Sequence, residues 1–117
     1  MKLAIIDHRC DESVEGIRRL SIMRESYTKR KTHVNISNSL QSFEKEYKTL
    51  DKYDGAILHP GIKDQKMCLS IIKNKYPNLN FVIAANFPPD YGFNGNVFLS
   101  DEYDKILKYF LENTKKE

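Results

Sequence analysis

Residues 53–59 read Tyr-Asp-Gly-Ala-Ile-Leu-His and are followed by Pro60 and Gly61. The run from Gly55 to Leu58 is apolar, and it stops at a histidine and then at a residue pair that cannot continue a strand ladder. Residues 3–8, Leu-Ala-Ile-Ile-Asp-His, have the same form. Short apolar runs without alternating polar residues are typical of strands buried on both faces of a sheet. We therefore predict one strand over residues 3–6 and another that ends at His59.

Three more segments have the character of strands. Residues 32–36 alternate apolar and polar side chains, which predicts a half-exposed strand at the edge of a sheet. Residues 81–85 form another buried strand after the turn at Pro77, and residues 97–99 form a short last one. Residues 86–96 contain two prolines and two glycines, so we expect an ordered loop there instead of a helix.

Helices are predicted where apolar side chains recur at helical spacing behind a capping residue. The first is capped by Asp11 or Ser13, and its expected inward face consists of Val14, Ile17, Leu20, Met23 and Tyr27. The second opens at Asn38 or Ser39 and turns inward Leu40, Phe43, Tyr47 and Leu50. The third follows Asp64, and its expected inward face consists of Met67, Cys68, Ile71, Ile72 and Tyr76. The last is capped by Ser100 or Asp101, and its expected inward face consists of Ile106, Leu107, Phe110 and Leu111.

Five strands that alternate with helices indicate an α/β domain with a parallel sheet covered on both faces. The 117 residues, 40% hydrophobic and 30% charged, fit one compact domain over 1–117. A formal charge of +3, from 19 basic and 16 acidic residues, is too mild to indicate a partner. We expect only the tail, residues 115–117, to fray.

Two cysteines without metal-ligand spacing favour a reducing compartment. Charged residues from Asp7 onward interrupt the N-terminal apolar run too early for a signal peptide, and no run is long enough to span a membrane. We therefore expect a cytoplasmic protein that does not act at a membrane.

The order of elements and the ends of the first and third strands resemble the CheY-like receiver domain of bacterial response regulators, over essentially the whole chain. The resemblance implies a five-stranded sheet of order 2-1-3-4-5 in a flavodoxin-like three-layer sandwich. The fourth helix of that family corresponds here to the loop over residues 87–96.

The functional positions of the family are largely replaced. Receivers carry an acidic pair at the end of the first strand, a phosphoacceptor aspartate at the end of the third, a serine or threonine after the fourth and a lysine after the fifth. The matching positions here hold Asp7 and His8, His59, Ala85 followed by Asn86, and Ser100 followed by Asp101. The chain is therefore similar to a pseudo-receiver that has lost its phosphoacceptor.

In a sheet of this order, ligands bind beyond the carboxyl ends of the strands, between the first and third strands. Phosphoryl transfer at such a crevice needs a carboxylate nucleophile, a magnesium ion and a cation beside the transferred group. Asp7 alone does not supply that set, so we expect neither enzymatic activity nor a cofactor.

Two alternatives use the same crevice. Asp7, His8 and His59 would suit zinc or another transition metal, although histidines at strand ends are usually just hydrogen-bonded and we expect no metal. A phosphate-carrying enzyme would use His59 or Cys10 as its nucleophile. The loop after the first strand, however, lacks the glycines of a phosphate cradle and carries two acids, Asp11 and Glu12.

Basic side chains are concentrated at one place, Lys29-Arg30-Lys31, behind a helix that carries Arg18, Arg19 and Arg24. Such a strip can contact phosphates. A solvated helix end is the more common explanation, so we do not expect nucleic-acid binding.

Aromatic residues gather in and after the Pro/Gly-rich loop, a composition enriched at protein interfaces. We take Phe87, Tyr91, Phe93 and Tyr103 as the candidate partner surface. The sequence thus predicts a phosphorylation-independent regulatory module of two-component signal transduction, which binds another protein or a second copy of itself.

Overall fold

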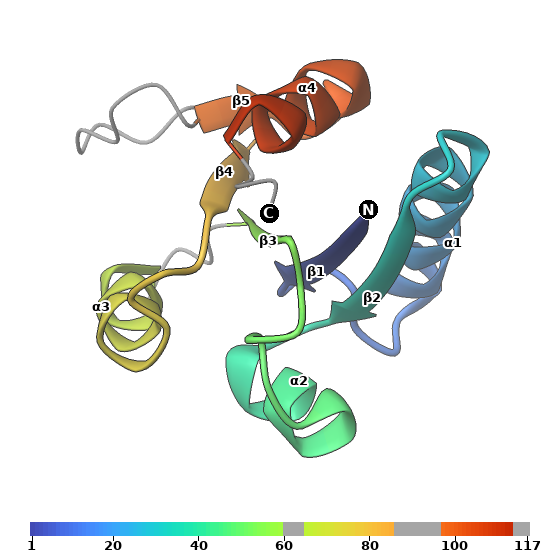
Figure 1. The fold of residues 1–117 in the computed structure, drawn as a ribbon. Helices are drawn as coiled ribbons and strands as arrows, with labels where there is room; N and C mark the ends of the chain where they lie inside the picture. The colour runs from blue at the N-terminus through green and yellow to red at the C-terminus, as the bar shows by residue number, and fades with distance from the viewer. Residues whose placement is uncertain (60–64, 86–96, 114–117) are drawn as a thin grey trace.

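The computed structural model describes residues 1–59, 65–85 and 97–113, with the backbone alone for residues 65–69. Its strands are β1 Lys2–Asp7, β2 His33–Ser37, β3 Gly55–His59, β4 Phe81–Ala85 and β5 Val97–Leu99. Its helices are α1 Val14–Lys29, α2 Leu40–Tyr47, α3 Gln65–Lys75 and α4 Tyr103–Asn113 (Figure 1).

The five strands form one all-parallel sheet in the order β2-β1-β3-β4-β5. This confirms the predicted α/β class and strand order, which together are consistent with a flavodoxin-like fold. It also confirms β2 as an edge strand. The predicted loop over 86–96 and the fraying tail over 115–117 lie outside the residues that the structure describes.

The helices cover both faces of the sheet, α1 and α4 on one side and α2 and α3 on the other (Figure 1). Successive strand residues point to opposite faces, so β1 contributes Leu3 and Ile5 to the α1/α4 side and Ala4 and Ile6 to the α2/α3 side. Each side has its own buried cluster. The first also contains Met23, Tyr27, Val82, Ile106 and Phe110; the second contains Leu40, Phe43, Leu50, Ile72, Tyr76 and Ile83.

Local side-chain chemistry fixes where two helices begin. The Ser13 side chain accepts a hydrogen bond from the backbone N–H of Gly16 at the start of α1, as the Ser39 side chain does from Ser42 at the start of α2. Each serine thereby satisfies a backbone donor that has no partner within the helix. One of the two predicted caps is correct in each case.

The predicted inward face of α1 is partly wrong. Val14 and Ile17 are 83% and 58% exposed, whereas Gly16 is buried. The buried stripe runs through Gly16, Met23 and Tyr27, with Leu20 packed against it. On a helix of about 3.6 residues per turn, Val14 and Ile17 lie about 160° and 100° around the axis from Gly16. Gly16 is buried because it packs against Asp11 of the preceding loop.

The predicted start of α4 is also wrong by one or two positions. The helix begins at Tyr103, so Glu102, and not Ser100 or Asp101, precedes it. The Glu102 carboxylate accepts a hydrogen bond from the Leu99 backbone N–H. The backbone carbonyl of Glu102 accepts one from the Ile106 backbone N–H. Of the predicted inward residues, Ile106, Leu107 and Phe110 are buried, but Leu111 is 59% exposed.

Candidate functional site at the carboxyl edge of the sheet

Strands β1 and β3 are neighbours in the sheet, and their last residues, Asp7 and His59, are paired in register. Their side chains therefore meet at the carboxyl edge, in the crevice where sheets of this order bind ligands. The structure brings together the two residues on which the sequence-based interpretation rests. His8 follows directly, and its ring centroid lies 5.1 Å from that of His59.

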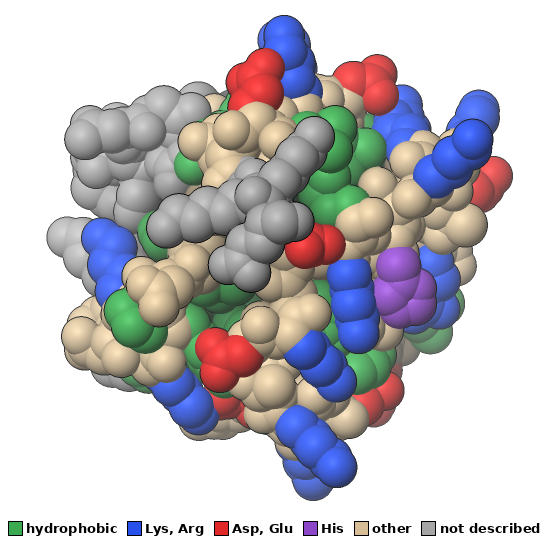
Figure 2. Space-filling model, in the orientation of Figure 1, with side chains coloured by type: hydrophobic (Ala, Val, Ile, Leu, Met, Phe, Trp, Pro, Cys, Tyr) green, Lys and Arg blue, Asp and Glu red, His purple; other side chains and the backbone are tan. Residues whose placement is uncertain are grey.

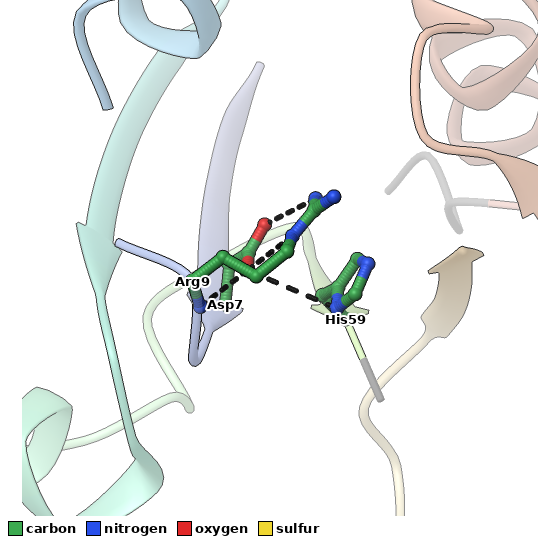
Figure 3. Close-up of polar contacts among 3 residues, drawn as sticks. All are labelled: Asp7, Arg9 and His59. Carbon is green, nitrogen blue, oxygen red and sulfur yellow. Dashed lines mark hydrogen bonds and ion pairs between the residues drawn. The ribbon is translucent and has the colours of Figure 1, made fainter. Parts of the chain in front are cut away.

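Asp7 is held by Arg9, two residues further along the chain (Figure 3). The Arg9 backbone N–H and Nε donate to Asp7 Oδ1 at 2.9 and 3.0 Å, and Nη2 donates to Oδ2 at 2.8 Å. Both carboxylate oxygens are thus engaged by a bidentate guanidinium, the strongest common arrangement for a carboxylate. The Asp7 side chain is 2% exposed and that of Arg9 is 16% exposed, so the pair is nearly excluded from water.

The pair sets the protonation state of Asp7. Burial alone raises the pKa of this carboxyl group, but the hydrogen bonds and charge of Arg9, together with His59, leave the pKa below its ordinary value. Asp7 is therefore ionised at neutral pH, and the guanidinium neutralises its charge.

His59 is unusual because neither ring nitrogen has a hydrogen-bond partner among the residues that the structure describes, although both are buried. Its side chain is 11% exposed, and Nδ1 lies 3.8 Å from Asp7 Oδ1. Burial lowers the pKa of His59 to about 4, despite the opposing attraction of Asp7. The imidazole is therefore neutral at pH 7, and its approach to Asp7 is not a salt bridge under those conditions.

Asp7, His8 and His59 also form a potential metal-ligand group. One ligand atom from each lies within 4.8 Å of the others. Two ligand atoms on a tetrahedral zinc ion are about 3.3 Å apart, given zinc–ligand bonds of about 2.0–2.1 Å. The group is thus slightly wider than a formed zinc site. Arg9 moreover places a positive charge beside the carboxylate that would bind the metal.

Cys10 follows Arg9 in the chain and lies in the turn after β1. Its backbone N–H donates to the Asp7 carbonyl at 3.0 Å, which forms the turn after β1. The thiol is buried, and burial, reinforced by the Asp7 charge, raises its pKa to about 11. A cysteine that acts as a nucleophile needs a lowered pKa and access to its substrate, so the structure argues against Cys10 as a phosphate carrier.

Ala85 and Ser100 mark the ends of the two remaining strands on this side. Ala85 is the last residue of β4, is buried and pairs with Leu99 of β5. Ser100 follows β5, is half-buried and borders a pocket beside Arg9. Both residues therefore lie at the carboxyl edge of the sheet with Asp7 and His59.

The structure tests the candidate partner surface only in part, because Phe87, Tyr91 and Phe93 lie outside the described residues. Tyr103 is half-buried: its ring packs edge-on against Tyr27 with centroids 5.2 Å apart. The Arg30 guanidinium lies over the same ring. Tyr103 is thus largely engaged within the domain.

The basic strip at the end of α1 is partly neutralised. Arg30 donates to Asp104 at 2.7 Å and to the Ser26 carbonyl at 3.0 Å. On the face in Figure 2, Lys and Arg side chains are dispersed among acidic and apolar ones and do not gather in one patch. The ion pair with Asp104 engages Arg30, one of the cations on which phosphate contacts by this strip would depend.

The sequence-based interpretation missed Arg9. The signal that would have pointed to it is an arginine two residues after a strand-ending aspartate, close enough to fold back on that carboxylate.

Comparison with family models, with curated proteins and with solved structures found nothing that matches this chain. None of the helices within the described ranges combines the length and the apolar character that crossing a bilayer requires. The function must therefore be argued from the site.

Proposed function

We propose that this chain is a receiver-like regulatory domain that has lost phosphorylation and acts by binding another protein. The observation that carries the proposal is the bidentate Asp7–Arg9 pair at the end of β1. In a receiver this position serves a magnesium ion. Here both oxygens of the carboxylate bind an internal guanidinium, which supplies the positive charge itself.

The second support is His59, which pairs in register with Asp7 where the resemblance places the phosphoacceptor. Its imidazole is neutral at pH 7 and cannot form an acyl phosphate. A buried neutral ring beside a neutralised carboxylate leaves this pair of strand ends without net charge. It does not offer the free carboxylates that a magnesium ion needs for phosphoryl transfer.

The phosphorylation arm of the proposal is tested with acetyl phosphate and magnesium. We expect no phosphoryl adduct by intact-mass spectrometry and no change in the amide NMR spectrum that depends on magnesium. Beryllofluoride is likewise expected to cause no magnesium-dependent change. A magnesium-dependent adduct, or a magnesium-dependent shift centred on Asp7 and His59, would refute the proposal.

The binding arm is tested by affinity co-purification from the cells that produce the protein. Leu99 on the edge strand β5 is 44% exposed and lies between Phe93 and Tyr103 in the sequence, whereas Ile71, 43% exposed, lies on α3 and is distant from these residues in the sequence. We expect a specific partner to be lost by Leu99→Asp and retained by the matched control Ile71→Asp. Equal retention by both variants would contradict the placement of the surface, and an absence of any stoichiometric partner would contradict the function.

A second candidate is a metal-dependent enzyme that uses Asp7, His8 and His59. It is favoured by the convergence of three ligand atoms and by the unpartnered nitrogens of His59, because a buried polar group without a partner calls for an explanation such as an ion. Three protein ligands would leave one position of a tetrahedral zinc ion open for water. Arg9 opposes this candidate, since a dication would have to compete with its guanidinium for Asp7 Oδ1.

Zinc titration calorimetry distinguishes the candidates. A metal site requires stoichiometric binding that His59→Ala abolishes and that Arg9→Gln strengthens by removing the competing charge. His33→Gln is the matched control, because His33 is an exposed histidine on β2, away from the crevice. If zinc does not bind, or binds all variants equally, the metal-dependent candidate is excluded.

A further inference from the structure

A pocket of about 280 Å³ lies at the carboxyl edge of the sheet, between the first half of α1 and the segment that joins β5 to α4. It lies near the Asp7/His59 crevice and shares Arg9 with it. Its walls are formed by Arg9, Glu15, Arg18, Arg19, Ile22, Met23, Ser100, Asp101 and Tyr103. Its volume is just below the usual range for small-molecule sites, which begins at about 300 Å³.

Three arginines line this pocket, and each has donors left over. Arg9 uses Nε and Nη2 for Asp7, whereas its Nη1 is buried without any partner. Arg18 approaches Glu15 only to 3.9 Å, too far for a hydrogen bond, and both side chains are exposed. Within the described part of the chain, no hydrogen bond or ion pair engages Arg19.

The acids in the wall do not satisfy these cations. Over the described ranges, the long contact with Arg18 is the one ion pair of Glu15, and Asp101 is exposed. The charge of Arg19 adds to the lowering of the pKa of His59 and opposes the rise in the pKa of Cys10. Unsatisfied guanidinium donors that converge on one cavity are suited to carboxylate or phosphate oxygens, which they bind in a bidentate fork.

Apolar groups line the rest of the pocket. Met23 is buried, Ile22 is 46% exposed, and the Tyr103 ring is fixed by Tyr27 and Arg30. The wall is therefore mixed, with these three side chains beside six charged or polar ones. The apolar part can contact a flat or apolar body behind the anionic group of a ligand.

We propose that this pocket binds a small organic anion, whose carboxylate or phosphate group is held by Arg9 and Arg19 and whose apolar body lies against Ile22 and Tyr103. The inference goes beyond the proposed function and does not depend on it, because the arginines line this pocket whether or not a protein partner binds at Tyr103. Arg9 connects the pocket to Asp7, because it lines the pocket and binds the Asp7 carboxylate.

The test uses phenyl phosphate and benzoate as probes, with amide NMR titration of the whole chain as the measurement. We expect saturable shifts at Arg9, Arg19, Ser100 and Tyr103, and weaker binding of inorganic phosphate and of neutral benzyl alcohol. The tighter of the two anionic probes identifies the group that the arginines prefer, and either result supports the site.

Variants locate the binding. Arg19→Gln should weaken it at least about tenfold, the usual effect of losing one charge-assisted hydrogen bond, and Arg19→Lys should weaken it less. The control Arg24→Gln lies on the same helix, is exposed and does not line the pocket, so it should bind as the wild type does. Three results would overturn the proposal: no saturable binding at millimolar probe, equal losses in the Arg19→Gln and Arg24→Gln variants, or equal affinity for benzyl alcohol.

Discussion

Acidification from pH 7 to pH 5 should destabilise this domain mainly through one side chain, His59. Its pKa is about 4 in the folded protein because burial disfavours the charged ring. In the unfolded chain a histidine has a pKa of about 6.5. The folded state therefore binds fewer protons than the unfolded state between these values. The stability from keeping the ring neutral is complete above pH 6.5 and is lost as the pH falls towards 4.

The size of the effect follows from the same two values. One pKa unit corresponds to about 1.36 kcal/mol, so the free energy of unfolding should fall by roughly 2 kcal/mol between pH 7 and pH 5 and by roughly 3 kcal/mol at pH 4. A domain of this size has a total stability of about 5–15 kcal/mol, so the loss is readily measured. The groups that act on the ring are Asp7, which opposes the shift, and Arg9, His8 and Arg19, which add to it.

Urea denaturation at several pH values between 5 and 7 provides the assay. His59→Gln should remove most of the slope, whatever its effect on absolute stability, while His33→Gln should keep the wild-type slope. Asp7 does not interfere in this range, because its lowered pKa makes its contribution disappear only below about pH 4. If the wild type and His59→Gln lose stability in parallel, the buried neutral imidazole is refuted.

Three further predictions concern the same region and the core. Arg9→Ala should lower the free energy of unfolding by about 2–4 kcal/mol at pH 7, because Asp7 loses its buried partner. Without Arg9 the pKa of Asp7 should rise, so the carboxyl group can take up a proton and the loss measured by denaturation should be smaller towards pH 5. A loss that does not change with pH would contradict this. Gly55→Ala should lower stability by about 1–3 kcal/mol, since a Cβ there would come within 2.2 Å of Phe110 Cε1, and an unchanged melting temperature would show that the ring can move. Iodoacetamide at pH 8 should label Cys10 slowly in the native protein and rapidly in urea, as followed by peptide mapping, because the thiol is buried and its pKa is about 11; equal rates would count against its burial.

Much of the fold was predictable because local signals agree with the global arrangement. The buried runs that end at Asp7 and His59 are long enough for strands and too short for helices, and Pro60 and Gly61 stop the second one. The inward face of α1 was not predictable from periodicity alone. Apolar Val14 and Ile17 fit a helical pattern, but the burial of Gly16 under Asp11 turns the helix away from them.

The candidate site was predictable to the level of the backbone. Parallel strands that end together place Asp7 near His59, and the register confirms it. The role of Arg9 depends on the turn between Asp7 and Cys10 and on the rotamer of a long side chain. Neither has a periodic signature in the sequence. The roles of Phe87, Tyr91 and Phe93 remain predictions.

The short distance along the chain between Asp7 and Arg9 has a consequence for folding kinetics. Closing a loop of two residues costs little chain entropy, so the carboxylate can meet its guanidinium before the sheet assembles. When β1 is then buried, the charge of Asp7 is already neutralised by Arg9. The folding barrier therefore need not include the cost of removing water from an unpaired carboxylate. His59 is much further from Asp7 along the chain, so their contact closes a longer loop. We therefore expect His59 to become buried late, when the sheet assembles cooperatively.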